Sequence, residues 1–180
     1  MTRSAIRCSS AALLLSGALS LTGTAQKATL PLAKGSTRFA VIGDTGTGDK
    51  PQYDIGRRLE EYRQRVEFTF AIMVGDNIYG SERPQDFQKK FEIPYKPLLD
   101  AGVNFHAALG NHDDPNQRFY KPFNMNGDRF YTFTKGNIDF FVLDSNYMDR
   151  KQLDWFERAI KDSKSDWKMA YFHHPLYSSG

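Results

Sequence analysis

The sequence predicts an α/β fold in which parallel strands carry metal-binding side chains to one edge of a sheet. Strand-like apolar runs alternate with helix-like segments, which is the pattern of strand-helix-strand crossovers. Four of these runs end in residues with oxygen or imidazole donors, and open α/β folds keep their sites at the carboxyl ends of strands. The four segments are Val41-Ile42-Gly43-Asp44, Met73-Val74-Gly75-Asp76-Asn77-Ile78-Tyr79, Ala108-Leu109-Gly110-Asn111-His112-Asp113 and Ala170-Tyr171-Phe172-His173-His174.

The N-terminal segment has the layout of a secretory leader. Arg3 and Arg7 precede a short apolar run at residues 11–15, and small residues follow up to position 25. This order is typical of segments removed on export, and the apolar run is too short to span a bilayer. We therefore expect a signal peptide at 1–25, a linker at 26–37 and one domain at 38–180, in a secreted or periplasmic protein without a membrane span.

Composition limits the partners and the metal chemistry. Removal of Arg3 and Arg7 with the leader lowers the basic residues from 24 to 22, against 21 acidic ones, which leaves a net charge of +1. This balance does not favour capture of nucleic acid, and basic pairs such as Lys89 and Lys90 are expected on solvated helix faces. Cys8 lies in the expected leader, so the mature domain must bind metals through oxygen and nitrogen.

The first half of the domain contains three expected strands and two helical segments. The strands are the apolar runs at 38–42, 68–74 and 103–109. A helix is expected from Pro51, because proline suits a first helical turn. Its expected buried face consists of Tyr53, Ile55, Leu59, Tyr62 and Val66. The second helical segment spans 84–100 and is interrupted by two prolines.

The second half begins with a polar, aromatic loop at 113–128. Two strands are expected at 129–134 and 138–143, and the sequence Lys135-Gly136-Asn137 between them predicts a hairpin. A helix at 151–162 and a last strand at 167–172 complete the expected elements, with boundaries uncertain by about 2–4 residues.

Asp44 and Asp76 each follow a glycine at the end of an expected strand. Glycine allows the sharp turn that presents the carboxylate beyond the sheet. Two carboxylates at one edge repel each other unless a cation lies between them. A carboxylate shared by two ions relieves this repulsion and sets up a two-metal site, with ions about 3.5–4 Å apart.

The four segments resemble the signature blocks of the calcineurin-like metallophosphoesterases. Tyr79, three residues after Asp76, resembles the purple, or tartrate-resistant, acid phosphatase branch. The resemblance runs from Phe39 to the end of the chain, with the blocks in the order of the family. It implies a sandwich of mixed sheets flanked by helices (αββα), of which the N-terminal part is present.

The resemblance also implies a set of metal ligands. Asp44 and Tyr79 correspond to ligands of the first metal, Asp76 to the bridging carboxylate, and Asn111 and His173 to ligands of the second metal. In the family the first ion is usually ferric, and the second is iron, zinc or manganese. The implied reaction is hydrolysis of phosphate esters by a metal-bound hydroxide that attacks in line with the leaving group.

The remaining histidines have different expected roles. His112 corresponds to the group that stabilises the transition state or protonates the departing alkoxide. His173, not His174, is the implied ligand, because the family places its ligand two residues before the proline, here Pro175. His174 is left to contact substrate phosphate or an outer carboxylate. His106 lies within an apolar run and is expected to be a core or edge histidine.

One departure from the family pattern affects the expected activity. The family's Gly-His-x-His block, which gives one imidazole to each metal, does not occur, since the four histidines are His106, His112, His173 and His174. We therefore expect that the sequence lacks the C-terminal part of the family fold. The resemblance implies a phosphatase acting on phosphate monoesters of small molecules or proteins, and the expected leader implies that it is exported. A phosphodiesterase or nucleotidase of the same family, and a non-catalytic fragment or pseudoenzyme, remain open alternatives.

A nucleotide-binding P-loop is the main rival interpretation of the glycine-rich segment 43–50. That motif requires Gly-Lys-Ser/Thr in succession. Here Asp49 separates Gly48 from Lys50, and Pro51 stands where the hydroxyl residue is needed. The segment therefore does not match a P-loop.

Overall fold

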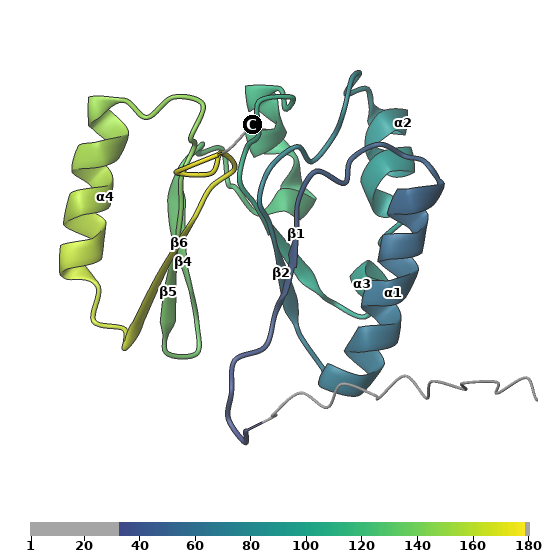
Figure 1. The fold of residues 1–180 in the computed structure, drawn as a ribbon, viewed down its shortest axis with the longest axis horizontal. Helices are drawn as coiled ribbons and strands as arrows, with labels where there is room; N and C mark the ends of the chain where they lie inside the picture. Colours follow the sequence, from purple (N-terminus) through teal and green to yellow (C-terminus); the bar gives the residue numbers. More distant parts are fainter. Residues whose placement is uncertain (1–32, 179–180) are drawn as a thin grey trace, which may run out of the picture. The chain divides into compact units, whose positions relative to one another are not determined.

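Two three-stranded sheets form the centre of the domain (Figure 1). The computed structural model describes residues 33–178, so the expected signal peptide lies outside the described residues. The first sheet has the order β1-β2-β3 and is parallel throughout; its strands are β1 (Ala40–Ile42), β2 (Phe70–Met73) and β3 (Asn104–Ala107). In the second sheet, β4 is antiparallel and β6 parallel to the central β5; its strands are β4 (Tyr131–Lys135), β5 (Ile138–Val142) and β6 (Trp167–Tyr171).

Helices cover the outer faces of both sheets. Helices α1 and α3 lie against the first sheet and α4 against the second, which gives the expected αββα order of layers (Figure 1). The helical elements are α1 (Lys50–Val66), α2 (Pro84–Phe87), the π-helical turn η1 (Gln88–Glu92), α3 (Lys96–Asp100), the 3₁₀ turns η2 (Pro115–Phe119) and η3 (Lys121–Phe123), and α4 (Arg150–Asp162). Within the described part of the chain, no helix has the length and hydropathy needed to cross a bilayer.

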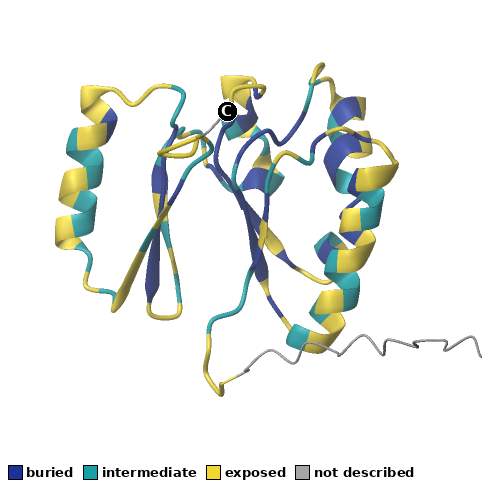
Figure 2. Cartoon of the chain, in the orientation of Figure 1, coloured by how far each residue is buried: buried dark blue, intermediate teal, exposed yellow. Residues whose placement is uncertain are grey.

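The two sheets face each other through aromatic side chains, and buried residues run along both (Figure 2). The His106 ring of β3 stacks on Phe133 of β4 with 3.8 Å between the ring centroids. Tyr131 and Tyr171 of the second sheet donate hydroxyl hydrogen bonds of 2.8 and 3.0 Å to the carbonyls of Ala107 and His106. These contacts tie the two sheets together near the ends of their strands. They also confirm that His106 is a core residue, since it is only 8% exposed.

The buried face of α1 differs from the expected one. Ile55 and Tyr62 are 43% and 58% exposed, whereas Gln52 and Gly56 are the buried residues of the helix. A Cβ atom at Gly56 would overlap the carbonyl oxygen of Pro94. The helix therefore approaches its neighbour too closely for a larger side chain. Apolar periodicity does not detect a contact made through glycine and an amide side chain.

Lys90 is buried, whereas its place in a basic pair had predicted a solvated helix face. It is 8% exposed, and its ammonium donates hydrogen bonds of 2.6 and 2.9 Å to the carbonyls of Tyr79 and Ser81. Its nitrogen also lies 3.7 Å from an Asp86 carboxylate oxygen. These acceptors offset the cost of burying the charge. Lys90 thereby holds the loop that carries Tyr79.

Candidate metal centre

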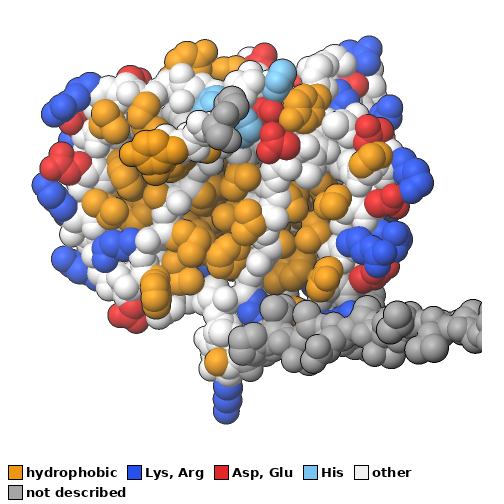
Figure 3. Space-filling view, viewed as in Figure 1, with side chains coloured by type: hydrophobic (Ala, Val, Ile, Leu, Met, Phe, Trp, Pro, Cys, Tyr) orange, Lys and Arg blue, Asp and Glu red, His pale blue; other side chains and the backbone are white. Residues whose placement is uncertain are grey.

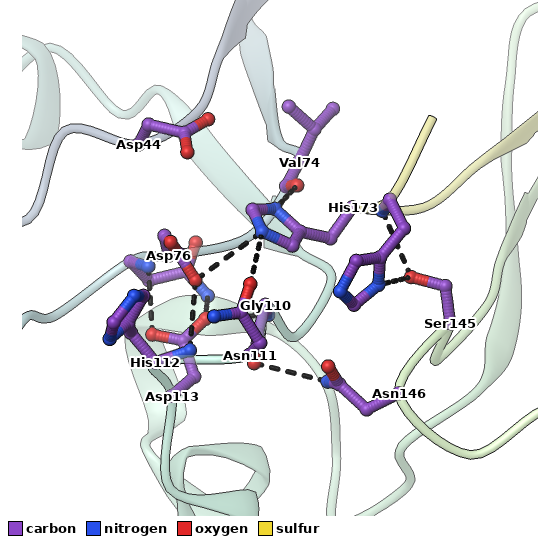
Figure 4. A network of polar contacts seen from close by, with 12 residues as sticks. Asp44, Val74, Asp76, Gly110, Asn111, His112, Asp113, Ser145, Asn146 and His173 are labelled. Atoms are coloured by element: carbon purple, nitrogen blue, oxygen red, sulfur yellow. Dashed lines mark hydrogen bonds and ion pairs between the residues drawn. The ribbon is translucent and has the colours of Figure 1, made fainter. Parts of the chain in front are cut away.

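The chain segments that follow β1, β2, β3 and β6 meet at one edge of the domain. Asp44, Asp76 and His173 each offer a donor atom, and these atoms all lie within 4.8 Å of one another. Histidine and acidic side chains are neighbours at this edge in Figure 3, and Figure 4 shows the cluster from close by. The structure thus brings together the segments that the sequence placed at strand ends.

Unusual backbone conformations aim the two carboxylates. Asp44 and Asp76 have φ angles of 54° and 53°, in the left-handed region that Asp and Asn enter more readily than most residues. Gly75, directly before Asp76, has a φ of 98°, and a Cβ atom there would lie 2.6 Å from Nδ1 of His173. Glycine is therefore needed at this position both for the turn and for the close approach of the imidazole.

The His173 ring is oriented like that of a metal ligand. Its Nδ1 lies 3.0 Å from the carbonyl oxygen of Val74, and because a carbonyl can only accept, Nδ1 carries a proton. Nε2 faces Oδ1 of Asn111 at 3.0 Å and Oδ1 of Asp76 at 3.5 Å (Figure 4). In a neutral ring, Nε2 then directs a lone pair toward two oxygen atoms. A bound cation would satisfy all three atoms, and metal-binding histidines are commonly fixed by such a second hydrogen bond.

Tyr79 adds a phenol oxygen to the cluster. Its hydroxyl donates to Oδ2 of Asp76 at 2.9 Å and lies 3.5 Å from Oδ1 of Asp44. Burial, followed by the contact with Asp76, raises the pKa of Tyr79 above its ordinary value. Among the described residues, no lysine or arginine forms an ion pair with Asp44 or Asp76. Oxygen and imidazole donors around uncompensated carboxylates fit one or more multivalent metal ions.

His112 and His174 contact different residues around the cluster. His112 donates its main-chain N–H to Oδ1 of Asp76 at 3.0 Å, and its exposed ring lies 5.0 Å from the Tyr79 ring. His174 instead contacts Ser145, whose Oγ lies 2.9 Å from Nδ1 and accepts the His174 main-chain N–H at 3.1 Å. The partner of His174 is thus a hydroxyl, not the carboxylate considered from the sequence.

Asp113 connects the loops that carry the candidate ligands. It is 9% exposed, Oδ1 accepts the main-chain N–H groups of Asn77 and Ile78 at 2.8 and 3.1 Å, and Oδ2 accepts that of Gly110 at 2.8 Å. Asp76 accepts a main-chain N–H from the Asp113 loop in return. Each loop therefore gives a carboxylate to the backbone of the other. This exchange fixes the loops after β2 and β3 relative to each other.

The loop between β5 and α4 borders the site but was not singled out from the sequence. Asp144 follows β5 as Asp44 follows β1, yet it is 1% exposed and accepts a hydrogen bond from Arg129 at 3.0 Å. Asn146, two residues later, donates to the carbonyl of Gly110 at 3.0 Å (Figure 4). The loop is therefore attached directly to the segment that carries the candidate ligand after β3.

Two buried glutamines hold the loops that precede α1 and α4. Oε1 of Gln52 accepts a main-chain N–H of the preceding loop at 2.7 Å, and Oε1 of Gln152 does the same for Asp144 at 2.7 Å. Both follow an N-terminal cap by three residues, Asp49 in one helix and Asp149 in the other. Asp-x-x-Gln is a helix-start signature that is visible in the sequence. It does not reveal the contacts made here, because the glutamine oxygens accept from Gly48 and Asp144 and not from the N-cap residues.

Two curated phosphatases have sequences similar to this chain. Tartrate-resistant acid phosphatase type 5 from Oryctolagus cuniculus is 24% identical over 196 residues, which cover 83% of this chain and 60% of that protein. Purple acid phosphatase 3 from Arabidopsis thaliana is 22% identical over 185 residues, which cover 81% of this chain and 50% of that protein. The chain therefore spans about half the length of the curated relatives it matches.

Solved structures share the fold. GAP50, the anchor in the inner membrane complex of Plasmodium, has a TM-score of 0.62 at 21% identity, covering 80% of this chain and 56% of that one. Purple acid phosphatase PPD1 from yellow lupin (Lupinus luteus) has a TM-score of 0.57 at 16% identity, covering 81% of this chain and 32% of that one. Residues 37–180 match the sequence pattern of the calcineurin-like phosphoesterases. The chain belongs to the calcineurin-like phosphoesterase family.

Proposed function

We propose that the protein is an exported phosphatase that uses two metal ions to hydrolyse phosphate monoesters of small molecules or proteins. The observation that supports this function is the convergence of Asp44, Asp76 and His173 within 4.8 Å, with Asn111 and Tyr79 beside them. These residues belong to four separate chain segments. Their meeting at one edge is difficult to explain by packing alone, because it gathers carboxylates without a lysine or arginine partner among the described residues.

Each candidate ligand has a proposed place. Asp44 and Tyr79 would hold a ferric ion, Asp76 would be shared, and Asn111 and His173 would hold iron, zinc or manganese. Such ions, when bound, polarise phosphate oxygens and lower the pKa of water. The backbone turns at both aspartates and the hydrogen bond from His173 to the main chain keep these donors in place before metal binds.

His112 is the proposed acid that delivers a proton to the departing alkoxide. Its main-chain N–H is held by Asp76, while its ring is exposed beside Tyr79. The loop is thus fixed and the imidazole remains accessible to a substrate. Asp113 supports this arrangement through its hydrogen bonds to both neighbouring loops. A positioned imidazole contributes about 10²–10⁴-fold to such a proton transfer.

Metal analysis of the full-length protein tests the site. We expect about two transition-metal ions per chain and their loss, together with all ester hydrolysis, in Asp76→Asn, because a shared ligand serves both ions. Asp100→Asn on the exposed side of α3 is the matched control and should keep both ions. Wild-type protein without stoichiometric metal would overturn the proposal.

Kinetic measurements test the roles of individual residues. His112→Ala should lower kcat by about 10²–10⁴-fold while metal content stays the same. Loss of metal in that variant would make His112 a ligand.

Tyr79→Phe should abolish a visible charge-transfer band of the iron form. Comparison of a monoester with a diester distinguishes phosphatase from phosphodiesterase activity, and the N-terminus of the mature protein tests export.

A further inference from the structure

A cleft of about 470 Å³ extends from the candidate metal centre to the loop between β5 and α4. Its lining residues include Gly110 and Asn111 on the metal side and Ser145, Asn146, Tyr147 and His174 on the other. Asn111 therefore belongs both to the candidate ligand set and to the cleft. A phosphate ester bound beside Asn111 can extend the alcohol part of the molecule into this space.

The loop that lines the cleft is built as a fixed surface. Gln152 is fully buried, and its Nε2 donates to the carbonyls of Asp144 and Tyr147 at 3.0 and 3.1 Å. Asn146 ties the same loop to the carbonyl of Gly110. A surface already held in this way does not need to be ordered when a ligand binds, which lowers the entropic cost of binding.

Tyr147 presents an aromatic ring at the cleft. The residue is 55% exposed, and the Arg129 guanidinium lies over its ring with 5.1 Å to the centroid. Arg129 is held in turn by Asp144. Arg129 lies over one face of the ring, and because Tyr147 is more than half exposed and lines the cleft, part of its side chain is accessible to a ligand. Offset stacking on such a ring contributes about 0.5–1.5 kcal/mol beyond the area that is buried.

Polar groups beside Tyr147 complete the surface. Ser145 contacts both the main chain and Nδ1 of His174, which orients the imidazole and leaves Nε2 for another partner (Figure 4 shows Ser145 and its contacts). The cleft therefore combines one aromatic face with a ring nitrogen that can form a hydrogen bond. This combination suits a planar ring that carries polar substituents better than a short aliphatic chain.

We infer that Tyr147, Ser145 and His174 form a subsite for the alcohol part of the substrate, which selects esters of planar, ring-bearing alcohols. This inference rests on the proposed phosphatase function. Tyr147 is its specificity-determining residue, while Ser145 acts by positioning His174. The metal ligands and His112 act on the phosphate, whereas this subsite acts on the group attached to it.

The test compares phenyl phosphate with ethyl phosphate as substrates of the full-length, metal-loaded protein. Tyr147→Ala should lower the ratio of the two kcat/KM values, phenyl over ethyl, by about 2- to 12-fold, mainly through the KM for the phenyl ester. Tyr62→Ala on α1 is the matched control, because Tyr62 is similarly exposed at 58% and does not line the cleft. An unchanged ratio in Tyr147→Ala would overturn the inference.

A binding measurement separates failure of this inference from failure of the proposed function. Phenylphosphonate and ethylphosphonate cannot be hydrolysed, so their affinities can be measured by calorimetry even without turnover. Preference for phenylphosphonate that Tyr147→Ala removes would support the subsite, and its absence would overturn it. Protein that keeps this preference but hydrolyses neither ester would retain the subsite and contradict the phosphatase. Protein that hydrolyses both esters with equal efficiency would retain the phosphatase and contradict the subsite.

Discussion

The loops after β1 and β5 have the same construction but offer different chemistry. In each, an aspartate lies two residues beyond the strand, Asp44 in one and Asp144 in the other, and a buried glutamine of the following helix holds the loop. Asp144 is 1% exposed and paired with Arg129, whereas Asp44 is exposed and has no such partner among the described residues. An aspartate at a strand end is therefore a candidate metal ligand only where no arginine already balances its charge.

In the comparison of these two loops, the largest expected effect comes from Asp44→Asn. This change should weaken metal binding at least about 100-fold, because even loss of groups that merely orient a ligand costs about 10–100-fold. The free energy of unfolding of the metal-free protein should hardly change, since Asp44 is exposed and forms no ion pair with a lysine or arginine among the described residues. Metal competition assays and urea unfolding measure the two quantities. Normal affinity in Asp44→Asn would remove it from the ligand set.

Asp144→Asn should show the opposite pattern. Loss of the carboxylate charge removes the closer of the two acidic partners of Arg129, since Asp149 lies 3.9 Å away, and it removes an acceptor from a buried position. The free energy of unfolding should fall by about 3 kcal/mol. The folded fraction should still bind metal with nearly wild-type affinity. If metal affinity falls as far as in Asp44→Asn, the distinction between the two loops is wrong.

The two loops belong to different sheets, and His106 lies at the contact between these sheets. The pH dependence of the protein's stability tests this contact. Burial, with a smaller contribution from Lys135, lowers the pKa of His106 to about 4, from 6.5 in the unfolded chain. The unfolded chain therefore binds more protons between these values, and stability is lost as the pH falls from about 6.5 to 4. Between pH 7 and pH 5, the free energy of unfolding of His106→Phe should fall by about 2 kcal/mol less than that of the wild type, measured by urea unfolding. Equal losses in both proteins would show that His106 does not titrate in this window.

The smallest effects are expected for the two glutamines. Gln52→Ala and Gln152→Ala should each lower the free energy of unfolding by about 1–2 kcal/mol, because main-chain groups lose their partners. Only Gln52→Ala should also weaken metal binding, since its loop carries Asp44. Only Gln152→Ala should raise the KM for phenyl phosphate. If both variants altered metal binding and the KM for phenyl phosphate in the same way, separate roles for the two loops would be contradicted.

Much of the fold followed from local patterns. The apolar runs located all six strands to within about two residues, and the glycine-asparagine turn located the hairpin. The segment 84–100 was recognised as helical, although it forms α2, η1 and α3 rather than one helix. The predicted buried face of α1 was partly right, since Leu59 packs against the core, but Ile55 and Tyr62 are exposed and the buried residues are Gln52 and Gly56. Patterns of apolar residues describe burial of apolar surface and miss contacts of this kind.

Local sequence patterns were sufficient to place the donors at the strand ends, because glycine-aspartate turns and apolar runs are local features. Other features depend on the folded chain: among the described residues Asp44 has no arginine partner while Asp144 contacts Arg129, Asp113 joins two loops, and Lys90 is buried. The physical reason is that the charge state and accessibility of a side chain depend on partners brought close by the fold. Residues 15 and 36 positions apart in the sequence make these contacts, and no local pattern encodes their meeting.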